Sequence, residues 1–169
     1  MQGSESILNY IEIKECDIAN GEGIRVSLWV SGCEHHCNEC HNPQTWELKN
    51  GKKFSMSELI QIEKLLNKNY ISGITFTGGD PLHPKNIDVI TSISKSLKEN
   101  YPNKTQWLWT GYKWEDIKHL PIMHNIDVLI DGKYEKDKRD ITLKWRGSSN
   151  QRIIDVQKSL LLEKIILTE

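Results

Sequence analysis

The chain has 169 residues, and its 22 Lys and Arg side chains nearly balance 23 Asp and Glu side chains, for a formal net charge of -1. This length predicts a single domain over residues 1–169, since it is short for two. The balanced charge offers no basic surface for nucleic acid or an anionic membrane, and no apolar run is long enough for a bilayer span. The start of the chain lacks the features of a secretion signal, and the expected location is the cytoplasm.

The first half of the chain predicts alternating strands and helices. Alternation of apolar and polar residues indicates a strand over 7–15, a glycine-containing loop follows, and a second strand is expected over 24–30. Ser55 and Glu58 form a capping-box pattern, and apolar residues at helical spacing predict a helix over about 57–69. β-branched residues bounded by glycine predict the next strand over 73–77.

The second half continues the same alternation. An apolar stripe predicts a helix over about 86–99, and strands are expected over 105–109, 126–130 and 153–156. A short helix is expected over 114–120, a charged surface loop over 135–140, and the tail at 160–167 fits either a helix or a strand. Such βα units indicate an α/β protein, and their number is too small for a full eight-unit barrel. We therefore expect a partial (β/α) barrel or an open, curved, mostly parallel sheet.

Three cysteines, Cys33, Cys37 and Cys40, follow the strand over 24–30 with the spacing C-x3-C-x2-C. Thiolates so close together indicate one metal centre, either zinc or iron–sulfur. A structural zinc ion needs a fourth ligand, for which the chain offers His35, His36, His41 or Cys16. A [4Fe-4S] cluster prefers four cysteines, so three would leave one iron free to bind another molecule. The spacing by itself leaves both readings open.

A second loop with chemical character is Gly78-Gly79-Asp80-Pro81, which follows the predicted strand over 73–77. Two glycines allow a ligand to approach the backbone, and carbonyl oxygens and the Asp80 carboxylate can accept hydrogen bonds from an ammonium group. Alone, this sequence is a common turn. Its specificity comes from its pairing with the three-cysteine loop at the carboxyl end of a neighbouring strand.

The cysteine motif and the Thr-Gly-Gly-Asp-Pro segment at 77–81 together resemble the radical S-adenosylmethionine superfamily. In that superfamily three cysteines hold a [4Fe-4S] cluster, and the fourth iron binds the amino and carboxylate groups of S-adenosylmethionine. Within it, the chain resembles the activating proteins of anaerobic, class III ribonucleotide reductases from about residue 8 to residue 156. The further matching segments are 20–25, Leu-Trp-Thr-Gly-Tyr at 108–112, Asp-Gly-Lys-Tyr at 131–134 and Trp-Arg-Gly-Ser-Ser-Asn-Gln-Arg at 145–152.

The resemblance implies a set of site residues. The metal ligands would be Cys33, Cys37 and Cys40, and the residues implied to bind the cofactor are Glu39, Cys40, His41, Gly78, Gly79, Asp80, Thr110, Asp131 and Lys133. Gly79 and Asp80 would meet the amino group, and Lys133 the carboxylate. Many superfamily members have an aromatic residue just before the last cysteine, or a tyrosine just after it, where this chain has Glu39 and His41. The resemblance implies no residue for acid–base catalysis.

The resemblance also implies an activity. Reductive cleavage of S-adenosylmethionine would give methionine and a 5′-deoxyadenosyl radical, which takes a hydrogen atom from a glycine of the reductase large subunit. The implied partners are that glycyl-radical subunit and a reduced flavodoxin-type electron donor, with no nucleic acid and no membrane. The whole chain would be a single radical S-adenosylmethionine domain. Trp114, Trp145 and Tyr134 are hypothetical contacts for the reductase.

Two alternatives stay open from the sequence. Within radical chemistry, the chain would activate another glycyl-radical enzyme or act as a small radical enzyme on a metabolite. In a different class, it would be a zinc-binding interaction module in which Cys33, Cys37, Cys40 and a histidine hold the metal. A brown protein with several irons and sulfides would exclude the zinc module.

Overall fold

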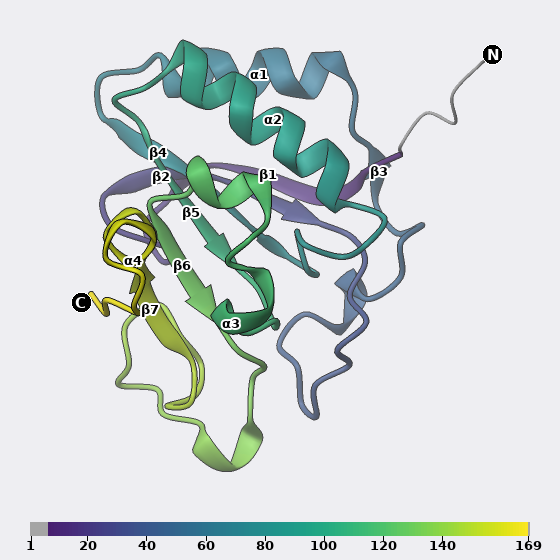
Figure 1. The fold of residues 1–169 in the computed structure, drawn as a ribbon. Coiled ribbons are helices and arrows are strands. Elements are labelled where there is room, and N and C mark those ends of the chain that lie inside the picture. The colour runs from purple at the N-terminus through teal and green to yellow at the C-terminus, as the bar shows by residue number, and fades with distance from the viewer. Residues whose placement is uncertain (1–6, 169) are drawn as a thin grey trace, which may run out of the picture.

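A computed structural model describes residues 7–168, in which one seven-stranded open sheet has the order β3-β1-β2-β4-β5-β6-β7 (Figure 1). The strands are β1 (Asn9–Asp17), β2 (Ile24–Val30), β3 (Lys52–Lys53), β4 (Ile71–Gly78), β5 (Thr105–Trp109), β6 (Val128–Asp131) and β7 (Arg152–Asp155). The α-helices are α1 (Met56–Leu66), α2 (Ile87–Asn100), α3 (Trp114–Ile117) and α4 (Val156–Leu162). Three short 3-10 helices are η1 (Pro43–Thr45), η2 (Pro121–His124) and η3 (Lys136–Lys138). None of the helices within 7–168 has the length and apolar character to cross a bilayer.

The pairing of the strands confirms an open α/β sheet with a parallel centre. Strands β2, β4, β5 and β6 are parallel neighbours, while β1, β3 and β7 pair antiparallel at the two edges. The parallel direction that βα units imply does not extend to the last strand, since β7 runs antiparallel to β6. The chain between them forms loops with only the short η3, without the crossover helix that usually joins parallel strands. In the tail left open from the sequence, 160–162 complete α4, and Leu167 then forms an isolated antiparallel bridge with Ile154.

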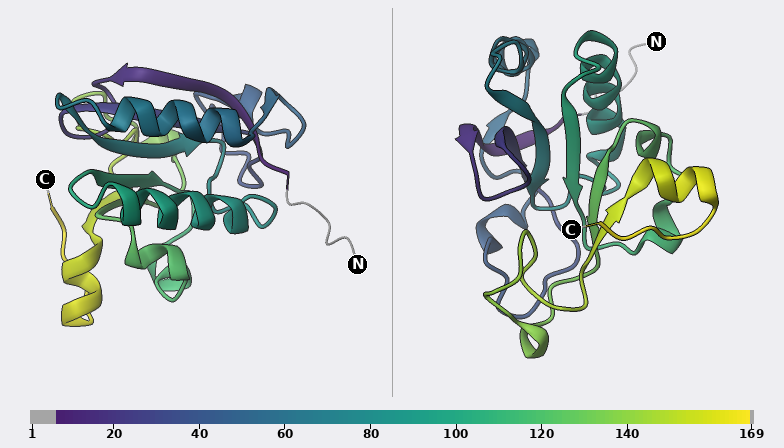
Figure 2. Two further views of the ribbon diagram at one scale, coloured as in Figure 1. Left: turned by 90° about the horizontal axis from the view of Figure 1, so that it is seen from above. Right: turned by 90° about the vertical axis from the view of Figure 1, so that its left-hand side faces the viewer.

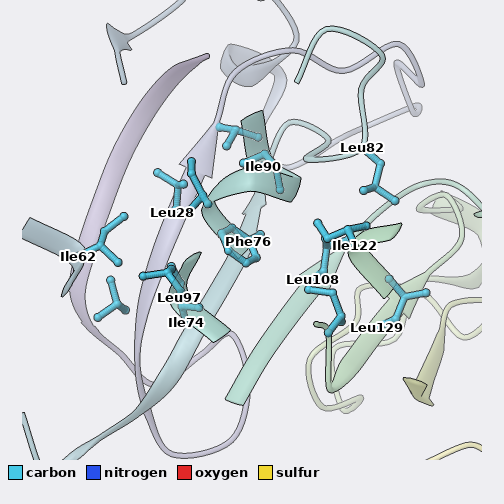
Figure 3. Packing of buried hydrophobic residues seen from close by; sticks show 14 of the residues in the cluster. Leu28, Ile62, Ile74, Phe76, Leu82, Ile90, Leu97, Leu108, Ile122 and Leu129 are labelled. Atoms are coloured by element: carbon cyan, nitrogen blue, oxygen red, sulfur yellow. The ribbon is translucent and has the colours of Figure 1, made fainter. Parts of the chain in front are cut away.

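The main core lies between the sheet and the two long helices. Strand side chains alternate between faces, and Leu28, Phe76 and Leu108 point from three neighbouring strands toward α1 and α2 (Figure 3). Figure 1 and the view from above in Figure 2 place both helices over the strands. As predicted, Ser55 and Glu58 form a capping box at the start of α1. The packing of α1 and α2 on the sheet holds the central strands side by side, with their carboxyl ends at one edge.

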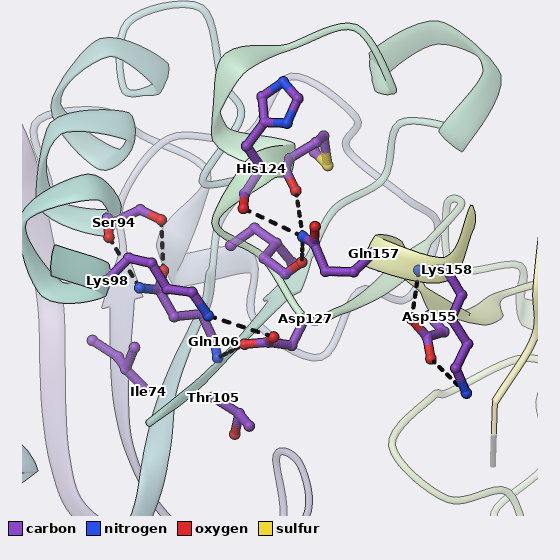
Figure 4. A network of polar contacts seen from close by, with 12 residues as sticks. Ile74, Ser94, Lys98, Thr105, Gln106, His124, Asp127, Asp155, Gln157 and Lys158 are labelled. Carbon is purple, nitrogen blue, oxygen red and sulfur yellow. Dashed lines mark hydrogen bonds and ion pairs between the residues drawn. The ribbon is translucent and has the colours of Figure 1, made fainter. Parts of the chain in front are cut away.

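A polar network fixes the other end of the sheet (Figure 4). The Gln106 amide donates to the carbonyl of Ser94 at 2.9 Å, and the backbone N–H of Gln106 donates to the Asp127 carboxylate at 2.8 Å. The amide of Gln157 donates to the carbonyl of Ile126 at 2.7 Å. These bonds join α2, β5 and α4. None of them uses a side chain from the loops that follow the carboxyl ends of the parallel strands.

The loop between β1 and β2 depends on a buried carboxylate. Asp17 accepts hydrogen bonds from the Ser27 hydroxyl at 2.7 Å and from the Asn20 amide at 2.8 Å, and it also caps the backbone of Ala19. Burial by itself raises the pKa of Asp17, but the hydrogen bonds from Ser27 and Asn20 outweigh it and lower the pKa below 3.8. The ionised carboxylate therefore stabilises the folded state above about pH 4.

We expect Asp17→Asn to lower the free energy of unfolding by about 1–2 kcal/mol at neutral pH, because one buried charge-assisted acceptor is lost. A group with a lowered pKa contributes stability above its unfolded pKa and loses it as pH falls through the folded pKa. Urea denaturation should therefore show the difference from wild type fading below about pH 4. Glu15→Gln, at an exposed position of the same strand, is the matched control. A difference that stays constant down to pH 3 would rule out this role for the carboxylate.

Candidate metal and cofactor site

Loops that follow the four parallel strands surround a cavity of about 500 Å³. The cysteine loop follows β2, the Gly78–Asp80 turn follows β4, and the loops after β5 and β6 complete the wall. Figure 1 shows the cysteine loop and the β6–β7 connection at the same lower end of the molecule, and the right-hand view of Figure 2 agrees. The carboxyl ends of parallel strands are a common ligand site, and here they bring all the predicted loops together.

Cys33, Cys37 and Cys40 all line this cavity and are all partly buried. The backbone N–H of Cys33 donates to the carbonyl of Trp46 at 3.0 Å, and left-handed residues at His36 (φ 46°) and Glu39 (φ 55°) curl the loop. Burial raises the pKa of Cys33 to about 11, and burial also raises the pKa of Cys37. A bound metal removes these thiol protons. Three soft donors around a cavity fit an iron–sulfur cluster with one open iron.

The fourth cysteine, Cys16, lies apart from the three clustered thiols. Among residues 7–168, no three Cys, His, Asp or Glu side chains, the three clustered cysteines included, converge as a site for a single metal ion. Cys16 is exposed near the end of β1, where Asp17 pairs with Arg25 at the start of β2. The cysteine loop begins after Val30, a strand length of roughly 17 Å away at about 3.3 Å per residue. Cys16 is therefore remote from the three clustered thiols.

The Gly78–Asp80 turn packs closely against the base of the cysteine loop. Gly78 has φ +106°, a conformation that side chains with a Cβ rarely adopt. A Cβ on Gly79 would lie 2.5 Å from the Gly32 carbonyl oxygen and 2.8 Å from that of Thr45. The backbone N–H of Asp80 donates to the same Gly32 carbonyl at 2.7 Å. The two loops can approach this closely only because glycines stand at both positions.

The Asp80 carboxylate is 1% exposed and is surrounded by donors from the chain itself. It accepts hydrogen bonds from the backbone of Leu82, the hydroxyl of Thr110, the backbone of Gly111 and the imidazole of His35. A carboxylate has about four lone-pair sites, and these four donors occupy them. An ammonium group at this place would have to displace one of these donors or bind backbone carbonyls instead.

Comparison with known proteins identifies the family. Residues 19–154 match the family described as a 4Fe-4S single cluster domain. A protein of Enterobacteria phage T4 is 49% identical over 146 residues, covering 86% of this chain and 93% of its own, and one of Pasteurella multocida is 45% identical over 152 residues, covering 86% and 96%. A third, from Escherichia coli K12, is 41% identical over 148 residues, covering 85% and 96%. All three are named anaerobic ribonucleoside-triphosphate reductase-activating protein.

The chain belongs to this family of activating proteins. The resemblance predicted from the cysteine motif and the Gly-Gly-Asp-Pro turn is thereby confirmed. A domain with one 4Fe-4S cluster also agrees with the three thiols that line the cavity.

The remaining cofactor residues predicted from the family pattern fall into two groups. Thr110 is buried, lines the cavity and donates to Asp80, and the exposed Lys133 lines the cavity as well. The Asp131 carboxylate instead accepts hydrogen bonds from the backbone of Trp114 at 2.8 Å and from the Arg152 guanidinium at 3.0 Å. Asp131 therefore positions the β6 loop and the start of α3, and Lys133 is the member of the pair that reaches the cavity.

The two positions that depart from the superfamily pattern also differ from each other. His41 lines the cavity, and its ring centroid lies 5.2 Å from that of Tyr134. The exposed Glu39 carboxylate forms an ion pair with Lys136 at 2.7 Å. His41 is thus placed to contact an aromatic ligand, while the Glu39 side chain joins the cysteine loop to η3. The charged segment 135–140, predicted as a surface loop, therefore contacts the cysteine loop through Lys136.

Sequence reasoning missed several residues of the wall. The β6–β7 connection contributes Arg139, Ile141 and Arg146, because only the folded chain brings it over the cavity. His35 was considered only as a zinc ligand, although it contacts Asp80. The hypothetical reductase contact Trp114 is wrong, since it is 4% exposed and part of the main core. The segment 131–146 has only two aromatic residues, Tyr134 and Trp145, and no local pattern marks Arg139, Ile141 or Arg146 as part of a site.

Proposed function

We propose that this protein activates an anaerobic ribonucleotide reductase by generating a glycyl radical on the large subunit. The observation that carries the proposal is the meeting of the three-cysteine loop and the Gly78–Asp80 turn at one cavity. A [4Fe-4S] cluster with bound S-adenosylmethionine would supply the electron that cleaves the cofactor to methionine and a 5′-deoxyadenosyl radical. The protein contributes binding, orientation and exclusion of water.

The residues of the chain divide this work. Cys33, Cys37 and Cys40 hold the cluster, and the backbone carbonyls at Gly78 and Gly79 accept from the cofactor amine, because the Asp80 carboxylate is already engaged. Lys133 faces the cofactor carboxylate, where opposite charges attract. The backbone at 39–41 and the His41 ring hold the adenine. Thr110 acts through Asp80, because its hydroxyl donates a hydrogen bond that maintains the orientation of the Asp80 carboxylate.

The rest of the wall suits a reactive radical. Trp29, Trp109 and Trp145 line the cavity below the cysteine loop, and their rings exclude water. The mouth between the cysteine loop and the β6–β7 connection would admit the glycine-bearing segment of the reductase. We further infer that the whole chain is one domain of the radical S-adenosylmethionine type, with its incomplete barrel leaving this opening. A flavodoxin-type protein in the cytoplasm would deliver the electron.

The test is direct transfer of the radical. Cluster-loaded protein, S-adenosylmethionine and a one-electron reductant are mixed anaerobically with an anaerobic reductase large subunit, and electron paramagnetic resonance is recorded. We expect a glycyl-radical doublet that is absent when the reductase glycine is replaced by alanine. A parallel mixture with a different glycyl-radical enzyme separates the alternative acceptor. Zinc in place of iron, with no radical in either mixture, would support the interaction module instead.

A further inference from the structure

One side chain of the cysteine loop reaches across to the neighbouring turn. His35 stands between the ligands Cys33 and Cys37, and its Nε2 lies 2.6 Å from Oδ2 of Asp80. The two side chains are 6% and 2% exposed, so this contact is shielded from water. Since the ionised Asp80 carboxylate can only accept hydrogen bonds, the His35 ring donates to it from Nε2. The bond joins two loops that are far apart in the sequence.

The His35 ring is also fitted into the loop after β5. Its centroid lies 4.6 Å from that of Tyr112, with an angle of 70° between the rings. A Cβ on Gly111 would lie 2.4 Å from the imidazole, and the backbone of Gly111 donates to the same Asp80 oxygen at 2.9 Å. His35 therefore contacts both the β4 turn and the β5 loop.

The adjacent histidine provides a contrast. His36 is exposed, and its ring stacks on Trp46 of the same segment with centroids 4.4 Å apart and an angle of 12°. Its contact is thus local, whereas that of His35 links separate strand ends. Both residues are histidines that stand between Cys33 and Cys37, so their variants can be compared directly.

We propose that His35 is a positioning residue that fixes the cysteine loop, which would hold the cluster, relative to the Gly78–Asp80 turn, which would bind the amine of S-adenosylmethionine. This inference rests on the proposed function. The three thiolates determine where the cluster is attached to its own loop. The distance from the cysteine loop to the carbonyls that would bind the amine depends on contacts between the cysteine loop and the Gly78–Asp80 turn. The buried His35–Asp80 bond is one of these contacts.

The experiment compares His35→Leu, His35→Gln and His36→Asn, the last because asparagine tolerates the left-handed backbone of residue 36. Each reconstituted protein is assayed for iron and sulfide, and the affinity for S-adenosylmethionine is measured from the change in the resonance spectrum of the reduced cluster. We expect His35→Leu to retain its iron and to bind S-adenosylmethionine about tenfold or more weakly, because a buried charge-assisted bond is lost. His35→Gln, which keeps an N–H donor, should restore most of the affinity, and His36→Asn should match wild type.

A second readout uses the cluster-free protein. Amide hydrogen exchange in His35→Leu should quicken both in 33–41 and in 78–82, because the His35–Asp80 bond holds these two loops together. Faster exchange confined to 33–41 would overturn the proposal even if His35→Leu failed to take up iron. Unchanged affinity in iron-replete His35→Leu, or failure of His35→Gln to restore it, would also overturn it. Failure of wild type itself to assemble a cluster would instead refute the proposed function.

Discussion

Replacing Cys37 with alanine is expected to abolish formation of 5′-deoxyadenosine. The three thiols all line the cavity, and removing one leaves two ligands where a cluster with an open iron needs three. Loss of a partner that merely supports a ligand costs about 10–100-fold, so loss of the ligand itself should lower product by at least about 100-fold. Iron and sulfide content, the visible absorbance and the yield of 5′-deoxyadenosine measure this effect after anaerobic reconstitution.

Cys16→Ala is the matched control, because Cys16 is exposed beside the opposite end of β2. This variant should load iron and cleave S-adenosylmethionine as wild type does. A Cys16→Ala protein without a cluster would mean that the fourth cysteine is a ligand and that this arrangement of the loops is wrong. A Cys37→Ala protein that still forms product would remove the basis of the proposed mechanism.

The largest effect on stability is expected at Arg25, which is 0% exposed. Its five N–H groups donate to the carbonyls of Glu22, Ile74 and Thr105 and to the hydroxyls of Thr75 and Thr105. The guanidinium thus joins β2, β4 and β5 on the face away from α1 and α2. Burial lowers the pKa of Arg25 to about 10, with nearby acidic residues opposing the shift, so the group is protonated at neutral pH.

We expect Arg25→Met to lower the free energy of unfolding by about 3 kcal/mol or more, because several buried acceptors lose their donors at once. Urea denaturation of the cluster-free protein measures this without interference from metal binding. Arg25→Lys should recover part of the loss, since an ammonium offers three donors where the guanidinium offers five. Arg139→Met, at an exposed arginine, should have little effect. Equal denaturation midpoints for Arg25→Met and wild type would show that the network is not needed for stability.

Much of the fold could be predicted from the sequence because its signals are local. The strand over 24–30 and the helix capped by Ser55 and Glu58 depend on residues within a few positions of each other, and the structure contains both. The short helix expected to reach residue 120 ends at Ile117 as α3, and β7 has the opposite direction to the one that βα alternation implies. Those errors concern how the chain returns to the sheet, for which local patterns carry little information.

The sequence by itself determined the chemistry of this protein. Cys33, Cys37 and Cys40 stand on one loop because of their spacing, and the glycines before Asp80 permit close contact wherever that turn is placed. Only the tertiary structure decided which groups each side chain meets. The Asp80 carboxylate accepts hydrogen bonds from three loops, and Asp131 accepts them from Arg152. The Arg25 guanidinium contacts three strands. These partners are distant along the chain, and their meeting depends on strand order and register, which the packing of the whole sheet sets.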